Sequence, residues 1–411
     1  MTKEDIVKAA FKVWGRDLYR TSSLSQVARE LGVSKPALYR HFENKGALIQ
    51  AMHNVFFDDF AALLREGYEK AKSGGTRQEN YLNIMRTIAE YYIRKREIFV
   101  FSLIRVYCRS EKDNIRKEFL RRGVDFEFLT TGKSETQAFP SNFHLIMATL
   151  IFWVSQYHQE NLENFRNRQE IPAETPDNEQ VKLILAEIES RIRRGLDLSA
   201  EKIAALDYER LEQQVNERIN GKISDNMDEN ALLKAVAGAV AEAGPWEVSM
   251  EMVARRSGLS KSGLYAHFKN KQDMLEKLLM SEFTGILNSA KTQIETSLVP
   301  EEQLYLGIIS IVDYLRHRPE FFLAMEWIKT RKLDLNKTAL AKIQYTIGDI
   351  KLEAVKKQDQ QWLILTAQWI FFMVISILTW GPQTKPQVPN ESFRCLFRFI
   401  AQGLEGMKNE V

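Results

Sequence analysis

The chain contains very little cysteine. Only two of its 411 residues are cysteines, Cys108 and Cys395, and they show no pairing pattern. Because disulfides accumulate in oxidising compartments, this usage predicts a protein of the reducing cytoplasm. The first residues begin an amphipathic helix and lack the apolar core of a signal peptide, which also predicts a cytoplasmic location.

Proline and strand-like patterns are also scarce. The chain has ten prolines, few glycine-rich runs and no regular alternation of apolar and polar residues. These absences predict an all-α fold. A hydrophobic content of 45% and a charged content of 27% are typical of a folded soluble protein, and the length predicts two or more domains.

The motifs of common enzymes are missing. The six histidines form no His-x-x-x-His or His-Glu-x-x-His pattern, and there is no phosphate-binding loop, Gly-x-Ser-x-Gly or Gly-x-Gly-x-x-Gly motif. The sequence therefore predicts a protein that is not an enzyme and has no metal site and no cofactor. The net charge of +3 is too small to indicate a nucleic-acid partner by itself.

An internal repeat dominates the sequence. The stretch SQVARELGVSKPALYRHFENK at 25–45 recurs about 226 residues later as MEMVARRSGLSKSGLYAHFKNK at 250–271. Twelve positions carry the same residue in both copies. The period is far longer than the roughly 20–50 residues of a solenoid repeat, so the repeated unit is a whole domain.

Each copy has the pattern of two short helices joined by a tight turn. In the first copy, Gly32 can adopt the left-handed conformation that ends a helix, and Ser34 can cap the next helix with its hydroxyl. Leu38 and Phe42 lie four residues apart and are expected in the core. In the second copy Gly258 and Ser260 hold the corresponding positions. A helix, a short turn and a helix form the DNA-reading helix-turn-helix.

The outer face of the second helix in each copy carries the residue types that contact DNA. A recognition helix enters the major groove with its N-terminal end, where polar and basic side chains meet base edges and phosphates. A lysine at the head of the following helix can share a phosphate with the helix dipole. The candidate DNA-binding residues are Ser34, Lys35, Pro36, Tyr39, Arg40 and Lys45 in the first copy, and Ser260, Lys261, Ser262, Tyr265 and Lys271 in the second.

The repeated string resembles the N-terminal DNA-binding domain of the TetR/AcrR family of bacterial transcription regulators, at about residues 6–48 and 232–275. The resemblance implies an all-α chain of two tandem units. Each unit would have a three-helix helix-turn-helix domain and a helical ligand-binding and dimerisation domain. It also implies a double-stranded DNA operator and a small-molecule effector as partners, with repression more expected than activation. By position, Tyr39, Lys45, Tyr265 and Lys271 match the family's phosphate contacts. Lys35, Pro36, Arg40, Lys261 and Ser262 match the base-reading surface.

Family members ordinarily carry one such domain per chain and form dimers, whereas this chain has two. We therefore expect an intramolecular pseudo-dimer, and the sequence leaves open whether two chains also pair. The expected domains are residues 1–48 and 229–275 for DNA binding, residues 49–198 and 276–411 for regulation, and a helical linker at 199–228. Residues 314–318 echo residues 92–96, which indicates that the duplication includes the regulatory domains.

The apolar stretch at 362–380 approaches the length of about 20 residues that a membrane span needs. It contains Gln368 and lacks flanking basic clusters, so burial explains it better and we expect no membrane association. In the resembling family the penultimate helix packs in a four-helix dimer bundle. This predicts that residues 145–154 and 363–378 form the contact between the two halves.

Aromatic residues indicate where an effector could bind, although aromatic side chains at helical spacing more often belong to a core. The candidates are Tyr92, Phe99, Tyr107 and Trp153 in the first half, and Tyr314, Trp327 and Trp369 in the second. No residue identifies the effector.

Charge differs between the two copies. Residues 1–50 carry nine basic and five acidic side chains, about four more basic than acidic, whereas the second copy is closer to neutral. Together with Ala266 in place of Arg40 and Ser262 in place of Pro36, this predicts unequal half-sites in an imperfect palindrome. The alternative is a small-molecule sensor or protein-binding adaptor in which one or both helix-turn-helix units no longer bind DNA.

Overall fold

The computed structural model describes residues 1–16, 23–72, 77–107, 112–124, 142–160, 179–223, 231–318, 360–380 and 388–407. These residues are helical with connecting turns, and no strand occurs among them. The all-α class predicted from the sequence is confirmed. The described residues divide into two compact units, one ending at Ile192 and the other beginning at Arg193.

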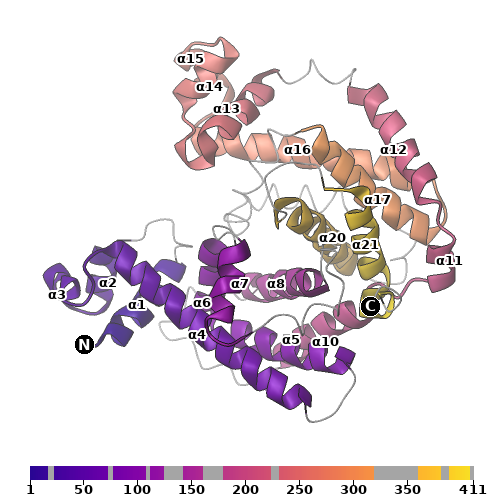
Figure 1. Ribbon diagram of the computed structural model, residues 1–411. Coiled ribbons are helices and arrows are strands. Elements are labelled where there is room, and N and C mark those ends of the chain that lie inside the picture. Colours follow the sequence, from indigo (N-terminus) through magenta and orange to yellow (C-terminus); the bar gives the residue numbers. More distant parts are fainter. Residues whose placement is uncertain are drawn as a thin grey trace. The chain divides into compact units, whose positions relative to one another are not determined.

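The first unit begins with three helices, α1 (Lys3–Arg16), α2 (Leu24–Glu30) and α3 (Lys35–Tyr39). They gather at one end of the long helix α4 (Lys45–Lys72), as Figure 1 shows. Buried side chains of α1, among them Ile6, Ala10 and Trp14, form the core of this group. We call this group of three helices, with the start of α4, head 1.

The rest of the first unit packs around α4 and its antiparallel neighbour α5 (Arg77–Arg94). A short helix α6 (Arg96–Phe101) contacts α1 and continues as one π-helical segment, η1 (Ser102–Tyr107). Helix α7 (Lys112–Leu120) contacts α4, and α8 (Asn142–Glu160) contacts α5. Helix α10 (Glu179–Arg194) follows and reaches the boundary with the second unit.

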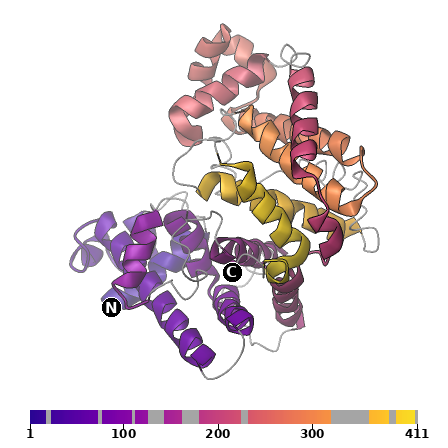
Figure 2. The same ribbon diagram turned by 45° about the vertical axis from the view of Figure 1, so that its right-hand side comes forward.

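The second unit repeats this plan. Helices α13 (Ala231–Glu247), α14 (Met250–Ser257) and α15 (Lys261–His267) gather at one end of α16 (Lys271–Ile294) and form head 2 (Figure 2). Helix α16 packs along α17 (Pro300–Arg316), which also contacts α20 (Gln360–Trp380) and α21 (Asn390–Gln402). A short 3-10 turn, η4 (Gly403–Glu405), follows α21.

The segment expected to be a helical linker belongs to the second unit and forms two helices rather than one, α11 (Ala200–Ala204) and α12 (Tyr208–Ile223). Helix α12 packs along α17 and buries Leu211 and Val215. Because both faces of α17 are covered, nearly all of its side chains are buried, including polar ones such as Glu301 and Gln303.

Among the described residues, no helix combines the length and the apolar character that a bilayer crossing requires.

Candidate DNA-binding sites

The turn of head 1 is built by local hydrogen bonds. Ser23 and Gln26 form a capping box at the start of α2, in which the Gln26 backbone N–H donates to Ser23 Oγ at 3.3 Å. Gly32 lies in the left-handed region at φ 66°, and the Val33 N–H closes the helix end on the Ala28 carbonyl at 3.0 Å. Leu38 of α3 is buried, which holds the recognition helix against the core.

Head 2 has the same turn. Gly258 has φ 69°, and the Leu259 N–H donates to the Ala254 carbonyl at 3.0 Å. Leu264 of α15 takes the place of Leu38 and is buried. A substituted Cβ would meet no atom within 4 Å at either glycine, so the positive φ alone explains why glycine suits these positions.

The two capping serines behave differently. Ser260 Oγ accepts a hydrogen bond from the Gly263 N–H at 3.0 Å, as expected for a helix cap. Ser34 has the extended backbone of a cap but makes no such side-chain bond, so the expectation of a hydroxyl cap at Ser34 is wrong. Pro36 lies in the first turn of α3, and its ring fixes φ near the helical value. The start of α3 therefore depends less on a side-chain cap.

The structure leaves the sequence-predicted DNA-binding residues on the surface. Tyr39 and Tyr265 are 46% and 47% exposed, although neighbouring apolar side chains in each recognition helix are buried. All eleven candidates are exposed except Lys271, which is half-buried: Ser34, Lys35, Pro36, Tyr39, Arg40, Lys45, Ser260, Lys261, Ser262, Tyr265 and Lys271. Within each head they come together at the recognition helix and the start of the next helix.

The long helices begin at the predicted lysines. Asn44 caps α4 by accepting the Ala47 N–H at 2.9 Å, and Asn270 caps α16 by accepting the Asp273 N–H at 2.9 Å. Lys45 Nζ lies 5.9 Å from the centre of the Trp14 ring. The ammonium of Lys45 therefore stands at a helix N-terminus, where backbone N–H groups and a cation favour an anion.

Some other charges in the heads are paired within each head. Lys12 Nζ lies 2.9 Å from Glu30 Oε1, and its hydrogen bond holds the pKa of Glu30 below its ordinary value. In head 2, Lys277 donates to the His267 carbonyl at 2.8 Å and lies 3.2 Å from Asp273.

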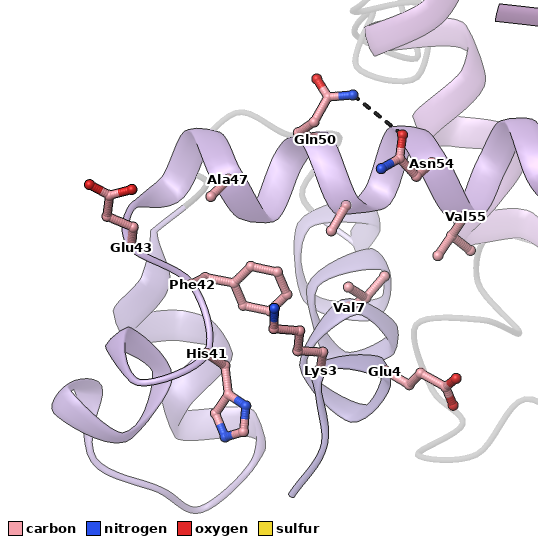
Figure 3. Close-up of a pocket in the computed structure, with 11 residues that line it drawn as sticks. Lys3, Glu4, Val7, His41, Phe42, Glu43, Ala47, Gln50, Asn54 and Val55 are labelled. Atoms are coloured by element: carbon pink, nitrogen blue, oxygen red, sulfur yellow. Dashed lines mark hydrogen bonds between the residues drawn. The ribbon is translucent and has the colours of Figure 1, made fainter. Parts of the chain in front are cut away.

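A pocket of about 460 Å³ lies in head 1 between the start of α1 and α4, which sequence reasoning did not anticipate. Figure 3 shows Phe42 and Val7 in it, with Lys3 beside the Phe42 ring. Lys3 Nζ is 5.8 Å from the centre of that ring. The complete lining is Lys3, Glu4, Val7, His41, Phe42, Glu43, Ala47, Gln50, Ala51, Asn54 and Val55.

In head 2 a lysine side chain covers the phenylalanine ring that corresponds to Phe42. Lys277, which occupies the position of Ala51, places Nζ 5.5 Å from the Phe268 ring centre.

The aromatic residues proposed for effector binding are mostly packed in the cores. Tyr92 and Phe99 are buried with ring centres 5.2 Å apart, and Trp153 and Trp369 are also buried. Tyr314 is half-buried and donates to Glu282 at 3.0 Å. Trp327 and the side chain of Tyr107 lie outside the described residues.

Beside Tyr92 lies a histidine. His158 Nε2 is 3.0 Å from the Tyr92 carbonyl, and burial lowers the pKa of His158 to about 3, so its ring is neutral. No cluster of three or more potential metal ligands occurs in the described part of the chain.

Two helical heads with an exposed recognition helix define a tandem helix-turn-helix protein. The profile described as bacterial regulatory proteins, tetR family, matches residues 6–52 and 232–278, which cover both heads. The chain belongs to the tetR family of bacterial regulatory proteins and carries two tandem units of that family. It is a DNA-binding transcriptional regulator, and membership implies binding to a DNA operator and dimerisation.

Solved structures with local similarity include two regulators. The TetR family transcriptional regulator PfmR from Thermus thermophilus is 21% identical, with 42% of this chain and 94% of that chain covered and a TM-score of 0.32. A TetR-like transcriptional regulator from a Rhodococcus species is 16% identical, with 44% and 95% covered and a TM-score of 0.31.

Proposed function

We propose that the chain is a cytoplasmic, ligand-responsive repressor that binds an imperfect palindrome with two fused helix-turn-helix units. The observation that carries this proposal is the presence of two complete heads in one chain, each with an exposed tyrosine on its recognition helix. An exposed tyrosine in a well-packed domain has no role in the core, and the same position is exposed in both heads.

The DNA contacts are proposed residue by residue. Tyr39, Lys45, Tyr265 and Lys271 contact phosphates, whereas the rest of the reading face meets base edges. That face consists of Ser34, Lys35, Pro36 and Arg40 in head 1, and of Ser260, Lys261 and Ser262 in head 2. Arg40 can read a guanine, but Ala266 at the same position cannot, so the two half-sites differ.

We propose that the two units form an intramolecular pseudo-dimer. Support comes from the presence of two complete heads in one chain of a family whose members dimerise. Gly195 and Gly403 each begin a Gly-Leu-acidic sequence after a helix. A Cβ on Gly195 would collide with the Ile400 carbonyl, and one on Gly403 would collide with the Arg193 backbone. Both contacts lie within the second compact unit. The apolar helices α8 and α20 are the proposed bundle partners.

In this arrangement residues 1–48 and 229–275 read DNA, residues 49–198 and 276–411 regulate, and residues 199–228 join the halves. The two recognition helices would stand about 34 Å apart, one turn of DNA.

The effector is proposed to bind in the aromatic interior of the regulatory domains. The Trp153 indole N–H supports this, because it is buried and has no hydrogen-bond partner in the described part of the chain. A buried N–H without a partner is unfavourable, and a planar or apolar ligand with one acceptor would satisfy it. The candidate residues are Tyr92, Phe99, Tyr107 and Trp153, and Tyr314, Trp327 and Trp369.

A selection of bound fragments from random duplex DNA at moderate salt tests the proposal, because affinity depends steeply on salt. We expect a two-part motif with unequal halves spaced by one helical turn. A single half-site would mean that head 2 is silent. No enrichment by folded protein would refute DNA reading and favour a sensor or adaptor.

A further inference from the structure

Three side chains connect the long helix of the first unit to the helix that follows it. The Tyr91 hydroxyl of α5 donates to Asp59 Oδ2 of α4 at 2.9 Å. Lys95 Nζ, four residues after Tyr91, donates to the same carboxylate oxygen at 3.2 Å. It also lies 4.9 Å from the centre of the Tyr91 ring. The three groups therefore contact one another and join α4 to the end of α5.

The second unit contains the same arrangement. The Tyr314 hydroxyl of α17 donates to Glu282 Oε2 of α16 at 3.0 Å, and Arg318 NH1 lies 3.7 Å from Glu282 Oε1. The Arg318 guanidinium is 5.7 Å from the centre of the Tyr314 ring. In both units the acid precedes the tyrosine by 32 residues. We call each set the clasp: Asp59, Tyr91 and Lys95 in the first unit, and Glu282, Tyr314 and Arg318 in the second.

The chemistry of the clasp is kept although two of its residue types differ. Asp59 corresponds to a glutamate and Lys95 to an arginine, so the carboxylate, the hydroxyl donor and the cation all recur. Gly285 adapts the second unit to this geometry, because a Cβ there would collide with the Tyr314 hydroxyl. Reuse of the same three groups in two diverged units indicates a shared role.

The tyrosine carries most of the connection in the first unit. Lys95 and Asp59 have side chains 51% and 36% exposed, so solvent weakens their ion pair. In the second unit Glu282 is only 9% exposed, and its hydrogen bond is better protected. Burial, together with the neighbouring carboxylate, raises the pKa of both Tyr91 and Tyr314, so both hydroxyls remain protonated donors.

The clasp holds the helix from which each head projects. Asp59 follows Lys45 by 14 residues, whereas Glu282 follows Lys271 by 11 residues. The difference of three residues corresponds to about 4.5 Å along a helix. The distance along the long helix from its first residue to the clasp therefore differs between the two units.

We propose that the clasp residues are positioning residues that hold α4 and α16 in the orientation in which the heads bind DNA. The inference rests on the proposed function in one respect, namely that each head reads its own half-site. A long helix that is not tied to its neighbour can shift along it, and the head at its end moves with it.

Replacement of Tyr91 or Tyr314 by Phe tests this, because it removes only the hydroxyl. We expect Tyr91→Phe to lower affinity for the half-site of head 1, and Tyr314→Phe for that of head 2, each by roughly three- to tenfold. Footprints on duplexes with one half-site scrambled measure this. Hydrogen exchange of α4 and α16 amides should accelerate in the affected unit.

Two comparisons keep the test specific. Glu90→Gln removes a carboxylate that pairs with Arg86 and Arg94 within α5, and it should change neither readout. The pair Asp59→Glu with Lys95→Arg recreates the residue types of the second unit and should retain wild-type affinity.

Unchanged affinity and unchanged exchange in Tyr91→Phe and Tyr314→Phe would overturn the proposal, as would equal weakening of both half-sites by either variant. If the wild-type protein selected no DNA, the proposed function would fail. The exchange measurement would still test the clasp: faster exchange confined to the affected long helix would support its positioning role, and unchanged exchange would overturn it.

Discussion

Exposed positions on the recognition helices differ between the two heads more than the buried positions of the same helices do. Leu38 and Leu264 are both buried and Tyr39 and Tyr265 are both exposed, but Arg40 is replaced by alanine. Core positions keep a head folded, whereas exposed positions are free to change with the DNA sequence that is read.

This contrast leads to a prediction about affinity. Lys35→Ala with Tyr39→Ala should reduce operator affinity at least tenfold and flatten its dependence on salt, because a cation near the phosphates is lost. Fluorescence anisotropy at several salt concentrations measures both effects. Lys261→Ala with Tyr265→Ala should have a smaller effect, since head 2 carries less net positive charge.

Lys202→Ala provides the control, because this exposed lysine lies on α11 outside the heads. An equal loss from all three variants would show that general charge, rather than the reading face, determines binding.

The sequence allowed some of these residues to be predicted but not others. Gly32 and Gly258 were predictable because a left-handed turn between two short helices strongly favours glycine. The clasp was not predicted, because Asp59 and Tyr91 meet only after two helices pack. The echo that paired Tyr314 with Tyr92 is off by one residue, since Tyr314 and Tyr91 make the equivalent hydrogen bonds.

Among the elements, α12 shows the largest difference between a sequence pattern and its packing. Its charged sequence is typical of a semi-rigid linker, but Glu212 makes three separate contacts on one side of the helix. Its carboxylate accepts hydrogen bonds from Tyr305, from Asn390 at 2.7 Å and from Arg394 at 2.8 Å. Tyr208 adds a ring contact to Tyr305 at 4.9 Å. A polar pattern thus does not distinguish a solvated helix from one docked through charge.

This docking predicts a pH dependence. Burial alone raises the pKa of Glu212, but hydrogen bonds from Arg394, Tyr305 and Asn390 outweigh burial, so the pKa lies below the ordinary value of a glutamate. A carboxyl with a lowered pKa stabilises the fold above its unfolded pKa, and this contribution is lost as pH falls. Glu212→Gln should lower the free energy of unfolding by about 1–3 kcal/mol near pH 7.

The difference between wild type and Glu212→Gln should shrink as pH falls below about 4.5, as measured by urea unfolding at several pH values. Glu209→Gln changes a carboxylate on the same helix that is exposed, and it should have little effect. A difference that stays constant from pH 7 to pH 3 would contradict the role of the charged Glu212.

Several helix boundaries followed closely from the sequence. The amphipathic pattern predicts a helix at 179–194, and α10 spans these residues. The linker was less predictable, because the start of α11 depends on a cap at Ser199 and the start of α12 on a cap at Asp207. Ser199 Oγ accepts the Lys202 N–H at 3.4 Å and Asp207 Oδ1 accepts the Arg210 N–H at 3.0 Å. Such short-range caps compete with a continuous charged helix.

For the molecule as a whole, a fused pseudo-dimer predicts that one chain occupies a complete operator. Covalent connection converts the second half-site contact into an intramolecular event, so dimer dissociation does not limit binding at low protein concentration. Sedimentation of protein mixed with an excess of a duplex that carries both half-sites should give one chain per duplex, and the binding curve should follow a single-site form.

Gly195→Ala probes the close contact between residues 195 and 400 within the second unit. At φ 60° and against the Ile400 carbonyl, an added Cβ introduces both backbone strain and a collision, whereas Gly258→Ala at φ 69° introduces strain alone. The strain is worth about 1–2 kcal/mol in each variant. The first variant should therefore unfold at a lower urea concentration than the second, and its operator complexes should lose one half-site footprint. Two chains per duplex in the wild type would instead mean that the chain pairs with a second copy and presents four recognition helices.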